Sequence, residues 1–131
     1  MVRCMAAAGA TSLSPIEILI IHSVRHRDRP KTLSDLCLVL DIDDTHIANY
    51  AVKKLEAAGL VTTGKLGKEK IIQTTEKGLQ ALKRYSEIRE RLLVEATKVS
   101  GLSQDNLSDI ASQLRALSGY YEQAARSAAT L

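Results

Sequence analysis

Aromatic residues are scarce in this chain, which has four tyrosines and neither tryptophan nor phenylalanine. Its core must therefore be built from Leu, Ile, Val and Ala, a composition that suits helix packed on helix. Hydrophobic residues make up 45% of the sequence and charged residues 25%, as in ordinary globular proteins. The length of 131 residues allows one hydrophobic core that needs no disulfide or metal to hold it.

Long apolar runs are also absent. The longest run begins at Ile18 and stops at His22, well short of the roughly 20 residues that cross a bilayer. No apolar stretch near the first residues has the features of a signal sequence. We therefore expect a cytoplasmic protein in which residues 1–13 form a flexible N-terminal lead.

Cysteine and histidine are few, and their spacing matches no common metal motif. Cys4 and Cys37 form no CxxC pair, and the three histidines at positions 22, 26 and 46 lack ligand spacing. Cys37 stands in an apolar run, which favours a buried thiol. The sequence does not say whether either cysteine has a redox role, and it predicts no metal and no cofactor.

The net charge is small, at +3. This value permits nucleic-acid binding without indicating it. The sequence has no Ser/His/Asp set, phosphate-binding loop or paired-carboxylate pattern above chance, so we do not expect an enzyme. The function must be inferred from the order of the secondary-structure elements.

The first helix is predicted to begin after Ser14. Pro15 suits the first helical position, and Glu17 completes a capping box with Ser14. Apolar residues then follow at helical spacing and predict the buried side of the helix: Ile16, Leu19, Ile20 and Val24. The helix is expected to end near His26, before a polar loop.

Two further helices follow, joined by a tight turn. Thr32 caps the first of them with Asp35, and Asp43 or Asp44 begins the second. Gly59 ends this third helix as a left-handed cap. Its inner face is Ala48, Ala51, Val52 and Leu55. Two short helices in this arrangement predict a helix-turn-helix.

A β-hairpin and two long helices complete the chain. Residues 60–63 and 70–74 are rich in strand-forming residues, and a glycine-bearing turn at 64–69 separates them. Thr75 caps a helix to about Val99, and Ser103 caps a last helix to about Arg126. The predicted fold class is mainly α with a small β-hairpin wing: a winged helix-turn-helix followed by C-terminal dimerisation helices.

Residues 14–80 resemble the MarR (multiple antibiotic resistance regulator) family. The matching segments are LSDL at 33–36, VKKLEAAGLV at 52–61 and TTEKG at 74–78. Residues 81–131 look like the two C-terminal helices of that family. The resemblance implies a DNA-binding region at 14–80 and a helical dimerisation region at 81–131. It also implies that Ile16 of the first helix joins the dimer interface.

The third helix carries the candidate reading residues on the face opposite its core: Thr45, His46, Asn49, Tyr50 and Lys53. Asn can pair with adenine, Thr can touch a thymine methyl group, and Lys can meet guanine or phosphate. An Asn-Tyr pair inside a helix is poor for helix propensity, which favours a functional role over a merely solvated face. Thr45 and His46 are equally consistent with local capping.

Phosphate contacts are expected from two further places. Lys65, Lys68 and Lys70 supply the charge of the wing, although the same lysines could simply keep a loop tip soluble. Thr32 and Ser34 begin the second helix, whose N-terminal amides suit a phosphate. The acidic residues Asp41, Asp43 and Asp44 count against close phosphate contact at the turn, unless one of them serves as a cap.

The final helix predicts a dimer interface through apolar residues spaced three and four apart: Leu107, Ile110, Leu114, Leu117 and Tyr121. Leu92 of the preceding helix is expected to join them. We therefore expect a transcription repressor that binds palindromic double-stranded DNA as a homodimer, with a possible small-molecule effector of unknown identity. The alternative is a winged-helix module that binds proteins and not DNA.

Overall fold

The computed structural model describes residues 1–26, 29–67 and 69–130. The chain divides into two units, Met1–Glu90 and Arg91–Leu131. The first unit contains α1 (Val2–Ala7), α2 (Pro15–Arg25), β1 (Lys31–Thr32), α3 (Leu33–Leu40), α4 (Thr45–Ala57), β2 (Val61–Leu66), β3 (Glu69–Thr74) and α5 (Glu76–Arg89). A π-helical turn (Glu90–Val94) follows, and the second unit continues with α6 (Glu95–Val99) and α7 (Gln104–Ala128).

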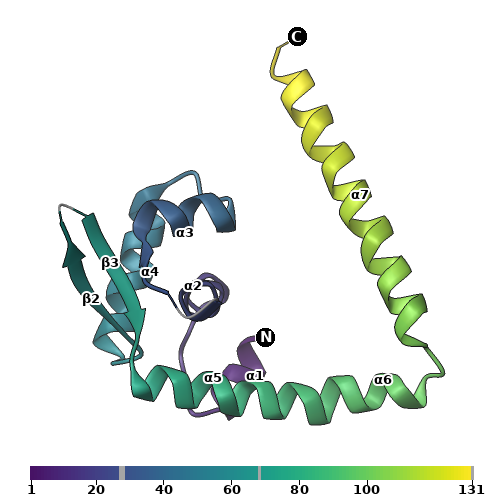
Figure 1. Cartoon of the computed structure of the whole chain (residues 1–131), viewed down its shortest axis with the longest axis horizontal. Helices are drawn as coiled ribbons and strands as arrows, with labels where there is room; N and C mark the ends of the chain where they lie inside the picture. The colour runs from purple at the N-terminus through teal and green to yellow at the C-terminus, as the bar shows by residue number, and fades with distance from the viewer. Residues whose placement is uncertain (27–28, 68, 131) are drawn as a thin grey trace. The chain divides into compact units, whose positions relative to one another are not determined.

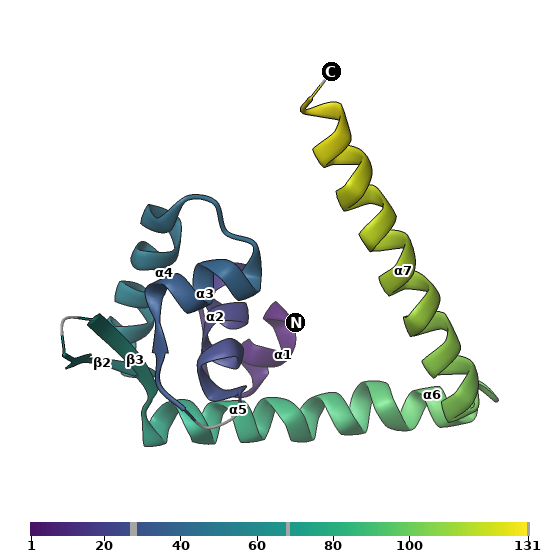
Figure 2. The same ribbon diagram turned by 45° about the horizontal axis from the view of Figure 1, so that its top comes forward.

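Helix α2 occupies the middle of the first unit. Figures 1 and 2 show it with α3 and α4 on one side and α1 and α5 on the other. It contacts α3, α4, α5 and β3. The start of α2 is the predicted one, because Ser14 accepts a hydrogen bond from the Glu17 amide and the Glu17 carboxylate accepts one from the Ser14 amide.

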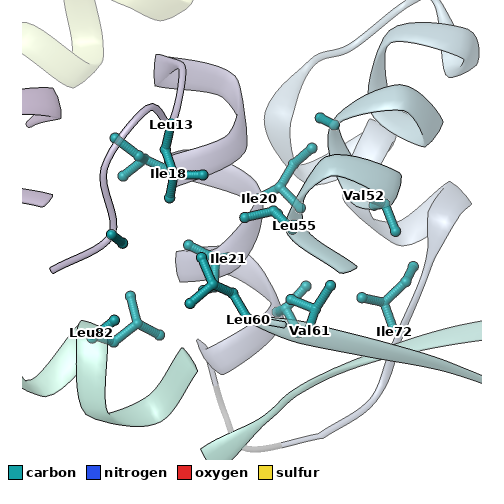
Figure 3. Close-up of a cluster of buried hydrophobic side chains, with 14 of the residues drawn as sticks. Leu13, Ile18, Ile20, Ile21, Val52, Leu55, Leu60, Val61, Ile72 and Leu82 are labelled. Carbon is teal, nitrogen blue, oxygen red and sulfur yellow. The ribbon is translucent and has the colours of Figure 1, made fainter. Parts of the chain in front are cut away.

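Aliphatic side chains from all sides of α2 form the core, as the lack of large aromatics predicts. Figure 3 shows ten of them by name: Leu13, Ile18, Ile20, Ile21, Val52, Leu55, Leu60, Val61, Ile72 and Leu82. The predicted inner face of α4 is confirmed, since Ala48, Ala51, Val52 and Leu55 are all buried. On α2 the expected burial of Leu19 is wrong. Leu19 is 43% exposed, and Ile18 and Ile21 are buried in its place.

The wing is part of a three-stranded antiparallel sheet with the order β1-β3-β2. Its hairpin is longer and its turn tighter than predicted, because β2 runs to Leu66 and β3 starts at Glu69. Gly67, with a φ of 63°, lies in the turn, where the left-handed conformation favours glycine. The two-residue strand β1, which pairs with β3 at Ile71 and Ile72, was not predicted.

The N-terminal segment differs from expectation. Residues 1–13 were expected to form a flexible lead, but the structure has the helix α1 there, and α1 contacts α5. The correction has a physical reason: Met5 is fully buried in the core cluster, and Ala10 and Leu13 are buried with it. The first unit also extends past the expected boundary at residue 80, because all of α5 belongs to it.

The predicted starts of the two long helices agree with the structure, but the first of them is interrupted by the π-helical turn (Glu90–Val94) before it reaches Val99. Thr75 caps α5, Ser103 caps α7, and Gly59 adopts the left-handed conformation after α4. The predicted fold class, mainly helical with a small hairpin wing, is confirmed. Among the helices of the described ranges, none has the length and apolar character that crossing a membrane requires.

Candidate nucleic-acid interface

Helices α3 and α4 form the helix-turn-helix, and short acidic side chains shape its turn. Asp41 ends α3 in the left-handed conformation, with a φ of 53°. Asp44 is the N-cap of α4, because its Oδ1 accepts a hydrogen bond of 2.8 Å from the His46 amide. One of the three acidic residues of this turn therefore serves as a cap. The sequence predicts that a phosphate can approach this turn closely only if one of these residues does so.

The exposed face of α4 carries the residues predicted to read DNA. Thr45, His46, Tyr50 and Lys53 are exposed, and Asn49 is half-buried. Tyr50 is 67% exposed. Since the buried residues of α4 lie on the other side, these five side chains share one accessible surface. We call this set the α4 face.

Helix α4 is tied to the start of α2 by an ion pair in which the carboxylate is buried and the ammonium group is partly exposed. The Glu17 carboxylate lies 2.8 Å from the Lys54 Nζ, and the Glu17 side chain is almost fully buried. Burial by itself would raise the pKa of Glu17, but hydrogen bonds from Lys54 and Ser14 outweigh burial, and the pKa lies below its ordinary value. The hydrogen bond to Glu17 raises the pKa of Lys54. Sequence reasoning found the Glu17 cap but missed this pair.

The C-terminal end of α4 is held by the first turn of α5. The Thr75 hydroxyl donates to the Gly59 carbonyl at 2.7 Å, and the Lys77 ammonium donates to the Ala58 carbonyl at 2.7 Å. These bonds satisfy carbonyl groups that a helix end leaves without partners. The wing joins the same region, because the Thr63 hydroxyl donates to the Glu56 carboxylate at 2.6 Å. The α4 helix, the wing and α5 are therefore linked by side-chain hydrogen bonds.

Two of the wing lysines face each other across the hairpin. Lys65 pairs with Lys70 in the β2–β3 register, and both are exposed. Like charges directly opposite each other destabilise a sheet, and an anion bound between them would relieve that repulsion. The third predicted lysine, Lys68, lies outside the described residues. The hairpin register therefore brings two of the three predicted wing lysines together.

Charge removal at the wing gives a testable result if these lysines meet phosphate. Lys65→Gln and Lys70→Gln should each weaken binding to all duplexes alike, and each should flatten the plot of log affinity against log salt by about one unit. Lys98→Gln, an exposed lysine on α6, is the matched control and should leave the slope unchanged. An unaltered slope in both wing variants would exclude the wing from the contact surface.

The N-terminus of α3 is less open to a phosphate than expected. The Thr32 hydroxyl accepts a hydrogen bond from the Asp35 amide at 3.1 Å, and the Asp35 carboxylate accepts one from the Thr32 amide at 2.9 Å. The hydrogen bond from the Thr32 amide, and after it the Thr32 side chain, lower the pKa of the Asp35 carboxyl below its ordinary value and keep it charged. The two predicted contact residues of this helix start therefore differ in accessibility. Ser34 is exposed, whereas the Thr32 side chain is half-buried and serves as the cap.

Comparison with known proteins identifies the domain. A family model described as a winged helix DNA-binding domain matches residues 13–78, just over half of the chain. The chain belongs to this family. The match spans α2 to the start of α5 and includes the helix-turn-helix and the wing. A comparison with curated protein sequences gives no match.

Solved structures of transcription regulators share the fold of this winged helix protein. A regulator from Thermotoga maritima is 23% identical with a TM-score of 0.60, over 92% of this chain and 84% of that one. A MarR-family regulator from Rhodococcus sp. RHA1 is 15% identical with a TM-score of 0.64, over 88% and 79%. BpsR from Bordetella bronchiseptica is 16% identical with a TM-score of 0.64, over 90% and 84%. The predicted MarR-like fold is confirmed.

A cavity of about 640 Å³ lies in the first unit of this winged helix protein, between the end of α2 and α5. His22 lines it and meets the Tyr85 ring edge-on, with 4.8 Å between ring centroids. The buried Nε2 of His22 has no hydrogen-bond partner. Three cationic side chains also line the cavity: Arg25, Lys83 and Arg89. No group of three or more metal-binding side chains occurs in the described ranges.

The environment of His22 should make the stability of the protein depend on pH. Burial, and then the charge of Arg89, lower the pKa of His22 below its ordinary 6.5. The unfolded chain therefore binds this proton more readily, and the free energy of unfolding should fall as the pH drops from 6.5 towards the lower folded-state pKa. Urea denaturation at about pH 7.5 and about pH 5.5 measures the loss.

The pH control uses two histidine variants. His22→Gln should reduce the loss of stability between the two pH values, because it removes the group that titrates in the cavity. His46→Gln changes an exposed histidine on α4 and should retain the wild-type loss. Equal losses in the wild type and in His22→Gln would show that His22 does not cause the pH dependence.

The second unit presents the apolar stripe predicted for dimerisation. No residue of α7 is buried, and its stripe includes Ile110, Leu114, Leu117 and Tyr121, which are 47%, 61%, 51% and 72% exposed. Leu107 is half-buried, and Leu92 in the π-helical turn is 60% exposed. Ile16 of α2, which the family resemblance placed in the interface, is half-buried against the core of its own unit. We use the name α7 stripe for five residues of this helix: Leu107, Ile110, Leu114, Leu117 and Tyr121.

Proposed function

We propose that this winged helix protein is a cytoplasmic transcription repressor that binds a palindromic operator as a homodimer. The observation that carries the proposal is the α4 face, where Asn49 and Tyr50 lie on the accessible side of a helix whose other side is buried. A helix of this kind fits the major groove, and a hairpin beside it can reach the adjacent backbone. The paired wing lysines support that second contact.

Selection of bound sequences from random duplex DNA tests the proposal. A homodimer should enrich a site with two inverted halves, spaced by about one helical turn of ~34–36 Å. Enrichment of a single, asymmetric half would contradict the palindrome. No enrichment at all would contradict DNA reading. Placement of the selected site across a promoter in a transcription assay then tests repression.

Asn49→Ala should weaken binding to the selected site by about 1–3 kcal/mol while binding to random duplex stays the same, if the amide makes a bidentate contact with a base. Alanine is the better helix former, so the substitution should not lower the melting temperature. Competition binding with selected and random duplexes gives the specificity ratio. An unchanged ratio would remove Asn49 from the set of reading residues.

A second candidate function is a protein-interaction module without DNA binding. Leu38 and Val39 of α3 favour it, because they are 84% and 68% exposed on the first unit. The acidic turn between α3 and α4 also favours it over a phosphate contact there. If the protein is such a module, duplex DNA should show no salt-dependent binding to it, and selection from random duplexes should enrich no sequence.

A small-molecule effector remains part of the proposal. DNA binding by BpsR, one of the proteins with this fold, is regulated by 6-hydroxynicotinic acid. In this chain the cavity beside His22 could admit a small molecule, and its cationic lining favours an anionic one. A thermal-shift screen of small anions, repeated with His22→Gln, tests the assignment. Shifts that are identical in the two proteins would place the effector elsewhere.

A further inference from the structure

Glu17 is buried more deeply than a capping residue needs to be. It is 2% exposed, and among the described residues only Lys31 is also charged and buried. Each carboxylate oxygen has a partner: Oε2 accepts from the Ser14 amide at 3.0 Å, and Oε1 lies 2.8 Å from Lys54 Nζ. A buried charge is costly unless it is paired, so the contact with Lys54 is what makes this position tolerable.

Capping alone does not explain the contact with α4. Asp35 of α3 makes the same reciprocal cap with Thr32 and stays half-exposed. In contrast, Glu17 reaches across to the next layer of the fold and holds a lysine whose side chain is 42% exposed. The buried carboxylate therefore fixes a cation at the edge of the protein surface.

The fixed cation lies beside a residue of the α4 face. Lys54 Nζ is 5.9 Å from the centroid of the Tyr50 ring, one helical turn away. This distance is within the range in which an ammonium group is attracted to an aromatic face. A chain of contacts thus runs from the buried carboxylate, through the ammonium group, to the exposed ring.

We infer that Glu17 is a positioning residue for DNA reading, which acts through Lys54 to hold the Tyr50 ring on the α4 face. The inference rests on the proposed function. It also divides two neighbouring lysines by role: Lys53 points its charge to solvent on the α4 face, whereas the charge of Lys54 is directed inward and is not a phosphate contact. The ring held in this way can pack on sugar and donate its hydroxyl to a phosphate.

The test compares three proteins on one selected duplex: wild type, Glu17→Gln and the double variant Glu17→Gln with Lys54→Met. Glutamine keeps the shape of Glu17 and removes its charge, so Lys54 is released. In Glu17→Gln, the specificity ratio should fall about two- to five-fold, as expected for loss of one ring–cation contact. The salt dependence should steepen by up to about one unit, because the released ammonium group becomes available to phosphate.

The double variant separates positioning from folding. It removes both charges and so leaves no unpaired buried charge. Its salt slope should return to that of the wild type, while the specificity ratio stays low. Tyr50→Leu should cost less specificity in Glu17→Gln than in the wild type, because the ring is already released in that variant. Equal costs in the two backgrounds would show that Glu17 acts independently of the ring and would overturn the inference.

The control is Ser14→Ala, which removes the other half of the cap and leaves the Glu17–Lys54 pair in place. It should lower stability without changing the ratio or the slope. If Glu17→Gln likewise lowers stability alone, Glu17 is structural and the inference is wrong. A wild type that shows no preference for any duplex would contradict the proposed function. A wild type that reads DNA, together with a Glu17→Gln variant that reads it equally well, would contradict only the inference.

Discussion

Gly78→Ala is expected to destabilise the first unit by about 3 kcal/mol or more, which approaches the total stability of a small domain. A Cβ at this position would overlap the Leu60 carbonyl oxygen and would lie 2.7 Å from Thr74 Cγ2. The Leu60 oxygen cannot easily move away, because it is backbone and accepts a hydrogen bond from the Thr75 amide. Urea denaturation followed by circular dichroism measures the loss.

The same substitution at another helical glycine is the control. Gly119 lies inside α7, and a Cβ there would meet nothing within 4 Å. Gly119→Ala should therefore stabilise the helix, by up to about 1 kcal/mol. Opposite signs for the two variants would attribute the effect to the contact with Leu60. A Gly78→Ala protein that unfolds at the wild-type urea concentration would contradict the close approach of α5 to Leu60.

Leu114→Glu is expected to convert the proposed homodimer into a monomer. The α7 stripe runs along a 25-residue helix, about 37 Å at 1.5 Å per residue, and it must be covered for the helix to be stable in water. A charge at its centre would be buried unpaired in a two-fold interface. Sedimentation velocity at micromolar concentration should give one 14.3 kDa species for the variant and twice that mass for the wild type.

DNA binding gives a second measurement of the same variant. Loss of the dimer removes the gain from two linked half-sites, so affinity for the selected palindrome should fall by about 100-fold or more. Ser112→Glu is the matched control, because 100° per residue puts Ser112 on the side of α7 opposite the stripe. It should remain dimeric. A wild-type chain that sediments at 14.3 kDa would contradict the homodimer.

Helix starts could be predicted from the sequence because they depend on local chemistry. A short oxygen-bearing side chain satisfies amides within three residues of itself, so no distant contact is needed to recognise it. The predicted caps Ser14, Thr32, Thr75 and Ser103 are all N-caps in the structure, and Asp44 resolves the choice left open at α4. The inner face of α4 could also be predicted, because helical spacing is likewise a local pattern.

Features that depend on distant contacts were missed. Helix α1 has no side-chain cap, and its position depends on Met5 being buried against residues far along the chain. The strand β1 has two residues, too few for an alternating pattern. At the candidate site, the pairing of Glu17 with Lys54 joins two helices, and no local pattern points from one to the other. The opposition of Lys65 and Lys70 required the strand register.

Both helices of the helix-turn-helix have a carboxylate near their start, at Asp35 in the first turn of α3 and at Asp44, the N-cap of α4. Such charges oppose indiscriminate attraction to phosphate, and the net charge of only +3 adds little to offset them. A genome offers about 10⁶–10⁹ competing sites, and time spent on each of them slows the search for the right one. If the protein binds an operator as proposed, these acidic helix starts should let it leave wrong sites quickly, so that its occupancy of the operator would depend on base contacts more than on charge.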